Sequence, residues 1–460
     1  MNIRPDAAGI AEVAAGSGEA CYLSIRTDIL RGVLRPRARL RIEGLRDAYG
    51  ASVSTLRDTL SRLAGEGLVG VEGHRGFAVA PVTRAEFRDL ADLRLLLEAH
   101  AIDRAFARGD LEWEGSVVGE HHKLAHLEAL MLAGERDRTE QWKHYDRAFH
   151  QALIAPCGSA GLVHAHRAIF DRYLRYQIVV MVFRGEVAAR EHRLLRDAAL
   201  ARDARGARAI LRRHIEACIE DTLGSDALED GPERTPPGAG LGAPAGATAG
   251  EKAWTRLRGE ILSGGLAPGR RLRLEVLRSD YGFGLSTLRE TLNRLATEGL
   301  VVAEGQRGFE VAPISPEDLR EVADLRLLIE THAMAASFRD GSIDWEARVV
   351  AAYHRLAAME ERMEAGDAAV TDQWKRYDWE FHQALISACG STVLMQLHGS
   401  VFDKYLRYQR IALSFRAGVA AREHKELLEH ALARDFAGAE RILAGHLAGG
   451  VRHALDSGRV

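Results

Sequence analysis

Cysteine and long apolar runs are both scarce in this 460-residue sequence, and their scarcity excludes several classes of protein. The four cysteines form no CxxC pair, so neither a disulfide framework nor a zinc ribbon is indicated. No run of about 18 uncharged apolar residues is present, and residues 1–18 lack the apolar core of a signal peptide. We therefore expect a cytoplasmic protein without a membrane span.

Net charge is also low, at −3, so the chain as a whole carries no electrostatic sign of a nucleic-acid partner. The charge is unevenly spread, however. Residues 20–85 contain eleven arginines and six acidic residues, and residues 252–316 contain ten basic and seven acidic residues. Two basic segments within an otherwise acidic chain are typical of regions that contact phosphates.

An internal repeat dominates the sequence. The segment STLRDTLSRLAGEGLV at 54–69 returns as STLRETLNRLATEGLV at 286–301, and QWKHYDRAFHQALI at 141–154 returns as QWKRYDWEFHQALI at 373–386. The offset is 232 residues throughout, and about half of the aligned positions are identical. A period this long indicates duplication of a whole two-domain protein and not a solenoid.

Each copy divides into a short head and a longer helical domain, and a segment rich in Pro, Gly, Ala and Thr joins the two copies. That segment cannot bury enough apolar surface to fold, so we expect a flexible linker that spans roughly 25–30 Å root-mean-square. The predicted boundaries are 20–82 and 83–224 for the first copy, 225–250 for the linker, and 251–314 and 315–457 for the second copy.

The heads have the pattern of a winged helix–turn–helix. In the first copy, helices are expected at 22–33, 42–49 and 54–67, and strands at 68–71 and 77–80 enclose a glycine turn. In such a fold the second helix braces against the DNA backbone, the third enters the major groove and the wing reaches a flanking groove. A protein-binding winged helix is the alternative, but the local positive charge favours DNA.

The start of the third helix supplies the residues expected to face DNA bases, and arginines further along are better placed for phosphates or the minor groove. The candidates in the first copy are Ser52, Ser54, Thr55 and Arg57 for the bases, with Arg62 and the wing residue Arg75 for the backbone. The candidates in the second copy are Ser286, Thr287, Arg289, Arg294 and Arg307.

Both longer domains have apolar residues at intervals of three and four throughout, which predicts antiparallel bundles of six or seven helices. The predicted fold class is therefore mainly α. It consists of two winged heads with small β wings, each followed by an all-α bundle.

Histidine is the informative residue type in these bundles, because six pairs among the nineteen histidines recur at the 232-residue offset. Asp146 and His150 are four residues apart, so a helix projects both from one face. His192 and His214 would lie roughly 33 Å apart on one unbroken helix. A turn at 202–206 would instead fold them into a hairpin in which both could face one point.

The second copy repeats these four residue types as Asp378, His382, His424 and His446. Three imidazoles and one carboxylate suit Zn²⁺, Mn²⁺, Ni²⁺ or Fe²⁺ and leave positions open for a ligand. A single histidine on a helix is more often a packed residue, and that is our interpretation of His100, His122, His166 and their counterparts in the second copy.

The motif G-x-L-x-P-G-x-R-L, followed by YG, TLRETL, EGLV and RGF, resembles the head of GntR-family bacterial transcription regulators. One departure matters. Members of that family commonly place an arginine that reads guanine just before the first Thr or Ser of the third helix, and here Val53 and Leu285 stand there. The resemblance therefore implies an operator that departs from the family consensus, with Arg57 and Arg289 left in place.

The helical domains resemble the FCD domain that follows such heads. Metal-binding members of that family share Asp-x-x-x-His, a second His about forty residues later and a third 22 residues after that, and both copies match at all four positions. The resemblance implies one divalent metal ion per helical domain, which helps to hold a small carboxylate effector. The recurring arginines that could bind this anion, or equally form surface ion pairs, are Arg94, Arg175, Arg190, Arg326, Arg407 and Arg422.

These features predict a transcriptional regulator of the repressor type that binds double-stranded operator DNA and responds to a small organic or sugar acid. A metal-dependent enzyme is the alternative, because an Asp/His₃ site with an open position can activate water. The sequence contains no HExxH helix and no evident base beside the ligands, so we expect no catalytic residues. A purely structural second copy is disfavoured, since both copies keep the ligands and the TLR motif.

Two copies in one chain can form a pseudo-dimer, whereas ordinary regulators of this family present two heads to a palindromic site as homodimers. The heads are not identical: Ala51, Val53 and His74 in the first correspond to Phe283, Leu285 and Gln306 in the second. We therefore expect an asymmetric operator with two unequal half-sites. Further pairing of whole chains stays open.

Overall fold

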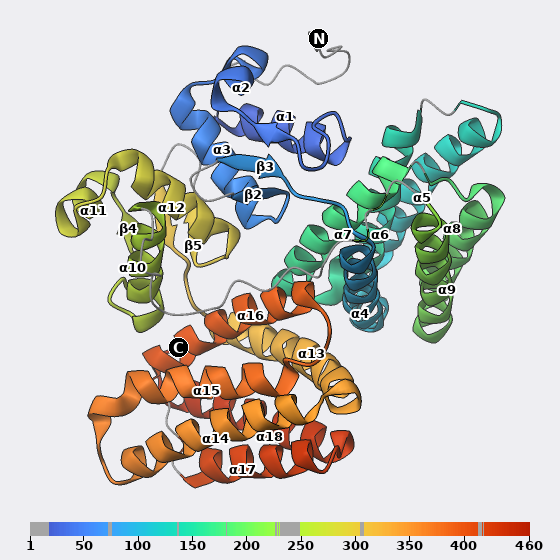
Figure 1. The fold of residues 1–460 in the computed structure, drawn as a ribbon. Helices are drawn as coiled ribbons and strands as arrows, with labels where there is room; N and C mark the ends of the chain where they lie inside the picture. Colours follow the sequence, from blue (N-terminus) through green and yellow to red (C-terminus); the bar gives the residue numbers. More distant parts are fainter. Residues whose placement is uncertain are drawn as a thin grey trace. The chain divides into compact units, whose positions relative to one another are not determined.

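A computed structural model describes residues 18–71, 76–135, 138–180, 182–225, 228, 230, 249–303, 308–412, 416 and 418–460. It divides into two compact units, each of which contains most of one copy of the repeat. Helices make up most of both (Figure 1), so the predicted fold class is confirmed. Within the described residues, no helix is long and apolar enough to cross a membrane.

The first head contains three helices and a small sheet. Helices α1 (Gly18–Leu30), α2 (Ile42–Tyr49) and α3 (Val53–Gly65) enclose a core in which Ile25, Ile29, Leu56, Leu60 and Leu63 are fully buried. The side chain of Ser52 accepts a hydrogen bond from the backbone amide of Thr55 and so caps α3, as Ser does at helix starts.

The sheet of the first head has one strand more than the sequence predicts. Strands β2 (Val69–Val71) and β3 (Phe77–Val79) pair antiparallel, as expected for a wing. Strand β1 (Arg39–Leu40) pairs with the other edge of β3, so the order is β1-β3-β2. Two residues are too few to show alternation, which is why the prediction of a two-stranded wing missed β1.

The second head repeats these elements at the same offset. Its helices are α10 (Ala249–Ser263), α11 (Leu274–Tyr281) and α12 (Leu285–Thr297). Its strands β4 (Arg271–Leu272), β5 (Val301–Ala303) and β6 (Phe309–Val311) form a sheet of order β4-β6-β5.

The described residues of the first helical domain form six α-helices, within the predicted number, and the short 3₁₀ turn η3. Their starts are capped by polar side chains at Thr83, Asp110 and Asp203. The elements are α4 (Arg84–Arg108), α5 (Leu111–Leu132), α6 (Thr139–Ile154), η3 (Ala155–Cys157), α7 (Ala160–Val180), α8 (Gly185–Leu200) and α9 (Ala204–Leu223).

The second helical domain has the same succession of α-helices, but its 3₁₀ turn precedes α15, whereas η3 of the first domain follows the corresponding helix α6. Ser315, Ser342, Ser391 and Asp435 cap four of them. The elements are α13 (Pro316–Asp340), α14 (Ile343–Glu364), η5 (Ala368–Val370), α15 (Thr371–Ile386), α16 (Thr392–Ile411), α17 (Gly418–Leu432) and α18 (Phe436–Asp456).

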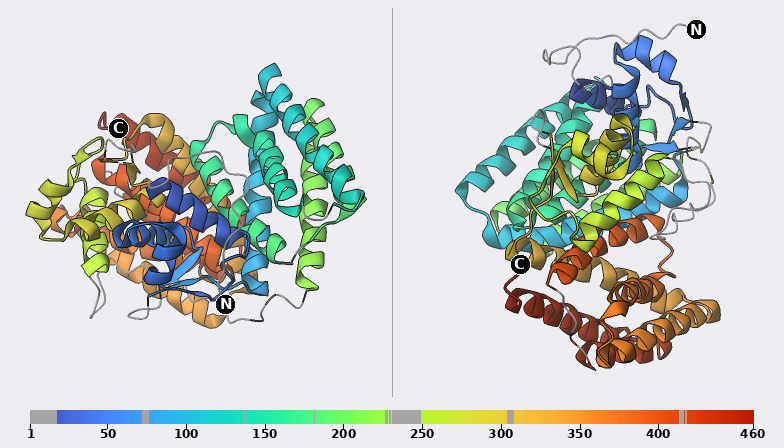
Figure 2. Two further views of the ribbon diagram at one scale, coloured as in Figure 1. Left: turned by 90° about the horizontal axis from the view of Figure 1, so that it is seen from above. Right: turned by 90° about the vertical axis from the view of Figure 1, so that its left-hand side faces the viewer.

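A tight corner between α8 and α9 forms the hairpin predicted at 202–206. Arg202 adopts a left-handed backbone conformation with φ of 57°, and the Asp203 side chain accepts a hydrogen bond of 2.8 Å from the Gly206 amide. Arg202 also donates to the Gly109 carbonyl and to Glu114, which fastens the corner to the junction of α4 and α5. Helices α8 and α9 consequently lie side by side, as Figures 1 and 2 show.

Replacement of Asp203 tests this corner. Asp203→Ala removes the cap of α9, which should cost about 1 kcal/mol of local stability. We expect faster hydrogen–deuterium exchange in the first turns of α9, measured by mass spectrometry. Asp203→Asn is the control, because the amide oxygen can still accept the Gly206 N–H. Equal exchange in wild type and Asp203→Ala would contradict the role of this cap.

Candidate metal centre and DNA-contacting surface

The four predicted metal ligands meet in both helical domains. Asp146 and His150 extend from α6, His192 from α8 and His214 from α9, and one ligand atom of each lies within 4.8 Å of the others. All four side chains are buried. The second domain groups the corresponding residues by the same criterion: Asp378, His382, His424 and His446.

Each imidazole of the first centre is oriented by a glutamate. His150 Nδ1 pairs with Glu98, and His192 Nδ1 lies 2.6 Å from Glu128. His214 Nδ1 lies 2.9 Å from Glu191. A carboxylate on one ring nitrogen fixes the tautomer and leaves the other nitrogen as a metal donor, which is the usual arrangement in metalloproteins.

The free ring nitrogens turn inward. His192 Nε2 lies 3.2 Å and His150 Nε2 lies 3.7 Å from Asp146 Oδ1. His150 Nε2 is buried and makes no hydrogen bond to a described residue, and the same holds for His382 Nε2 in the second centre. Buried polar atoms without a partner are rare and call for an explanation, and a cation between these donors supplies one.

The second centre repeats the orienting pairs. His382 pairs with Glu330, His424 Nδ1 lies 2.7 Å from Glu360, and His446 Nδ1 lies 2.8 Å from Glu423. Sequence reasoning missed all six glutamates. The signal that could have found them is their recurrence at the 232-residue offset, since Glu98, Glu128 and Glu191 return as Glu330, Glu360 and Glu423.

The protonation states follow from burial and from these pairs. Burial lowers the pKa of His214 to about 3, so that imidazole is neutral and able to donate to a metal. Burial also disfavours charge on His192, but its contacts with Asp146 and Glu128 outweigh burial and raise its pKa to about 9. Without a metal, His192 is therefore protonated on both ring nitrogens at neutral pH, and a divalent cation would displace its extra proton.

A small cavity of about 10 Å³ adjoins the first centre, lined in part by Lys143, Gln177 and Arg184. This space is enough for about one water molecule. Lys143 is buried and donates a 2.6 Å hydrogen bond to Gln177 Oε1, and burial lowers the pKa of its ammonium. Sequence reasoning missed these residues too, although they recur as Lys375, Gln409 and Arg416.

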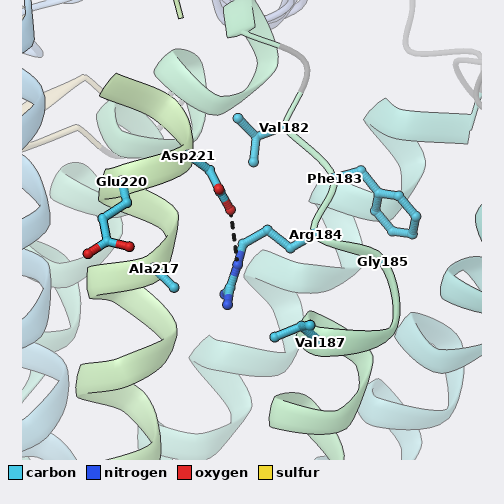
Figure 3. Close-up of a pocket in the computed structure, with 8 residues that line it drawn as sticks. All are labelled: Val182, Phe183, Arg184, Gly185, Val187, Ala217, Glu220 and Asp221. Atoms are coloured by element: carbon cyan, nitrogen blue, oxygen red, sulfur yellow. Dashed lines mark ion pairs between the residues drawn. The ribbon is translucent and has the colours of Figure 1, made fainter. Parts of the chain in front are cut away.

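Arg184 also borders an outer cleft of about 690 Å³, shown in Figure 3. Its guanidinium donates 2.9 Å and 3.2 Å hydrogen bonds to Glu191 and to the carbonyl of His214, and it forms a 3.3 Å ion pair with Asp221. The same arginine thus lines both the outer cleft and the metal-side cavity, and it holds the glutamate that orients His214.

Of the predicted effector-binding arginines, Arg94 and Arg326 lie close to the centres. Arg94 is buried, pairs at 3.1 Å with Glu98 and lies 4.0 Å above the Phe170 ring. Arg326 pairs at 2.8 Å with Glu330 in the same way. Each is therefore already held by the glutamate that orients the first histidine of its centre.

The other four arginines lie elsewhere in their domains, and their role in effector binding stays a prediction. Arg175 donates to the Ala80 carbonyl, and Arg407 donates to the Ala312 carbonyl, both where the head chain enters its helical domain. Arg190 and Arg422 are exposed, on the opposite side of their helices from the buried histidines two residues later. Recurrence alone could not separate these structural positions from ligand-binding ones.

The predicted base-facing residues lie at the start of α3 and α12. Ser52, Ser54 and Arg57 are exposed and Thr55 is half-buried. The second copy shows the same pattern, with Ser286 and Arg289 exposed and Thr287 half-buried.

The arginines predicted to contact the DNA backbone differ in their settings. Arg62 donates a 2.8 Å hydrogen bond to Glu19 and lies 3.5 Å above the Tyr22 ring, so it is held against α1. Arg294 is half-buried. The wing residues Arg75 and Arg307 lie outside the described residues.

Helix α7 joins the first head to its metal centre. Asp171 on α7 forms an ion pair with Arg26 of α1, and Arg26 also pairs at 2.9 Å with Glu66 at the end of α3. On another face of α7, Tyr173 and Gln177 hydrogen bond to each other, and Gln177 lines the metal-side cavity. In the second copy Arg258 pairs with Asp403 of α16 and with Glu298.

Replacement of Arg26 tests this junction. Arg26→Ala leaves Asp171, whose side chain is 8% exposed, without one of its cationic partners. We expect faster hydrogen–deuterium exchange in α1 and in the first half of α7, with the exchange of α8 and α9 unchanged. Arg46→Ala is the control, because that arginine is 57% exposed and pairs only with its neighbour Asp47 among the described residues. Equal exchange in both variants would rule out a specific role for Arg26.

In each copy of the repeat, two family models match one after the other. The model of bacterial regulatory proteins of the gntR family matches residues 18–79 and 250–311, and the FCD domain model matches residues 89–217 and 321–449.

Individual relatives align with about one copy each. An uncharacterized HTH-type transcriptional regulator, BphR of Paraburkholderia xenovorans LB400, is 37% identical over 43% of this chain and 81% of its own length. The HTH-type transcriptional repressor GlaR of Escherichia coli K12 is 36% identical over 42% of this chain and 90% of its own. The solved structure of E. coli McbR/YncC covers 46% of this chain and 98% of its own, with 18% identity and a TM-score of 0.39.

These matches are to transcriptional regulators and not to enzymes, which removes the metalloenzyme alternative. The chain belongs to the GntR family of bacterial transcriptional regulators with an FCD domain, and it is a tandem fusion of two copies of that architecture.

Proposed function

We propose that this DNA-binding regulator is a repressor whose helical domains each bind a divalent metal ion and, with it, a small carboxylate effector. The observation that carries the proposal is the arrangement of three glutamate-oriented histidines and one aspartate around a common point, present twice. Three nitrogen donors and one oxygen donor suit Zn²⁺, Mn²⁺, Ni²⁺ or Fe²⁺. A bound metal would supply a cationic anchor for the carboxylate of an organic or sugar acid.

The charges around the centre support an anionic effector. Lys143 and Arg184 both border the metal-side cavity, and both are buried or nearly so. The cavity of about 10 Å³ is too small for an acid of several heavy atoms, whereas the outer cleft of about 690 Å³ has room for one. Because Arg184 lines both spaces, an entering carboxylate would reach it first and would compete with Glu191 and Asp221 for its guanidinium.

Helix α7 is the proposed route from the effector to the DNA. It carries Gln177 at the metal-side cavity and Asp171 at the contact with the head. A rigid helix held at both ends passes a small displacement at one end to the other. The effector then changes DNA affinity only to the extent that it binds one head arrangement better than the other.

The fusion supports recognition of two half-sites by one chain. Both heads expose the same Ser and Arg positions at the start of the third helix, yet Val53 of the first corresponds to Leu285 of the second. Each head would therefore read its own half-site of an asymmetric operator, with the linker holding the pair together. His74 and Gln306, the other expected difference in the wing, lie outside the described residues.

Metal content tests the centres directly. We expect two divalent ions per chain by elemental analysis of the purified protein, one for each Asp/His₃ group. His192→Ala or His424→Ala should each remove one ion, and the double variant should remove both, because a single lost ligand weakens such a site severely. His122→Ala is the control, since that histidine is exposed and lies outside both groups. Metal-free wild-type protein after reconstitution would contradict the proposal.

DNA binding tests the heads. We expect the protein to bind the non-coding region beside its own gene, and Arg57→Ala and Arg289→Ala each to weaken binding about tenfold through loss of a base contact. Footprinting should show that each variant loses a different half-site. The control is Arg190→Ala, which removes an exposed arginine of the helical domain.

The same DNA should be released by small carboxylic acids when the metal is present, measured by fluorescence anisotropy. Release that persists unchanged after removal of the metal would separate effector binding from the metal centre. Absence of any DNA binding at low salt would overturn the proposed regulation at this locus.

A further inference from the structure

The two metal centres are close copies, but their surroundings differ one helical turn beyond the third histidine. Cys218 lies four residues after His214 on α9 and lines the metal-side cavity. The corresponding position on α18, four residues after His446, is Gly450. Lys143, Gln177 and Arg184 of the first cavity are all preserved in the second copy, whereas Val182, which also lines that cavity, corresponds to Ser414.

The difference between Cys218 and Gly450 changes the contacts of a buried tyrosine hydroxyl. In the first domain Tyr173 accepts a 3.0 Å hydrogen bond from Gln177 Nε2, and its hydroxyl also contacts the Cys218 thiol. The Tyr173 side chain is completely buried. Its hydroxyl is thus engaged by two protein groups.

In the second domain the equivalent hydroxyl has shifted into the space that glycine leaves. A β-carbon at position 450 would lie 2.3 Å from the Tyr405 hydroxyl oxygen, so no larger residue fits there without moving the tyrosine. Tyr405 is 1% exposed. Gln409 lies beside its hydroxyl, but the hydroxyl makes no well-oriented hydrogen bond with any described residue.

A buried hydroxyl without a well-oriented hydrogen bond is unfavourable, and native structures leave few of them. The Tyr405 side chain packs against residues around the second centre: the Arg326 guanidinium lies 4.8 Å from its ring centroid, and its neighbour Gln409 accepts a 2.8 Å hydrogen bond from Lys375. A ligand that occupies the second centre is therefore the natural source of the missing hydrogen bond.

We propose that the two helical domains prefer different acids: the second selects a carboxylate that also carries a hydroxyl, which pairs with Tyr405, and the first selects the acid without that hydroxyl. This inference rests on the proposed binding of a carboxylate at the metal centres. In the first domain Gln177 and Cys218 already contact the tyrosine hydroxyl, and Cys218 supplies a side chain where the second domain has glycine. A site built to pair with a substrate hydroxyl discriminates against the analogue that lacks it.

The regulator would therefore respond to two different acids, one at each helical domain. Tyr405 lies on α16, which also carries Asp403 and Arg407, and these contact the second head through Arg258 and the Ala312 carbonyl. Tyr173 lies on α7, which holds the first head in the same manner. Each acid would therefore act on the head that its own domain holds.

The test uses the full-length, Zn²⁺-loaded chain with one centre disabled at a time. His192→Ala leaves only the second centre, and His424→Ala leaves only the first. Isothermal titration calorimetry then compares pairs of acids that differ by one hydroxyl: acetate with glycolate, butyrate with 3-hydroxybutyrate, and succinate with malate. We expect the affinity ratio of the hydroxylated to the plain acid to be about fivefold higher at the second centre, as for one added neutral hydrogen bond.

Two variants test whether the Tyr405 hydroxyl and the Cys218 side chain cause the difference in ligand preference. Tyr405→Phe removes only the hydroxyl and should reduce the ratio at the second centre to that of the first. Cys218→Gly should raise the ratio at the first centre, because it creates there the space that Gly450 leaves in the second. Zn²⁺ content measured on each variant shows whether its remaining centre is intact.

The outcomes separate this inference from the proposed function. Equal ratios at the two centres, or a ratio at the second centre that Tyr405→Phe leaves unchanged, would overturn the difference in preference while carboxylate binding stands. Binding of none of the six acids to either Zn²⁺-loaded centre would overturn both.

Discussion

Buried pairs between glutamates and histidines hold each helical domain together at one point. In the first domain these pairs form two groups: Glu98 of α4 with His150 of α6 and His166 of α7, and Glu128 of α5 with His192 of α8 together with Glu191 of α8 with His214 of α9. Asp146 of α6, 3.2 Å from His192 of α8, joins the two groups. Carboxylates buried this deeply are costly unless positive charge balances them. Asp146 adds a further carboxylate at the centre, so a bound cation would both satisfy the ligands and stabilise the bundle.

Two of these glutamates also pair with arginines, which links the centre to its surroundings. Glu98 is shared by His150, His166 and Arg94, and together the histidine and the arginine keep its pKa well below the usual range despite complete burial. Glu191 is shared by His214 and Arg184. Under the proposed function, an anion that draws Arg184 away would loosen the group that orients a metal ligand. One carboxylate would then couple the cleft to the metal centre.

The sequence allowed prediction of whatever depends on local spacing or on the repeat. That Asp146 and His150 share one face follows from helical geometry. That His192 and His214 meet requires only a turn between their helices, which Arg202 makes in a left-handed backbone conformation. The glutamate partners could not be predicted, because Glu98 and His150 are 52 residues apart and meet only through packing of α4 against α6. Arg175 recurs as faithfully as the ligands, yet it serves the head–bundle junction. Recurrence in two copies therefore does not tell a ligand from a structural residue.

Duplication within one chain explains why the two centres can diverge at all. In a homodimer every substitution appears in both subunits, so Cys218 could not become glycine in one centre alone. Two independent genes could diverge, but their products would assemble into a mixture of pairs. A covalent linker holds one copy of each kind at a high effective concentration, which makes the mixed pair the only product of the gene. The fused chain keeps the differences between Val53 and Leu285 in the heads, and between Cys218 and Gly450 in the bundles, in separate copies. Under the proposed function they would give each copy its own operator half-site and its own ligand preference.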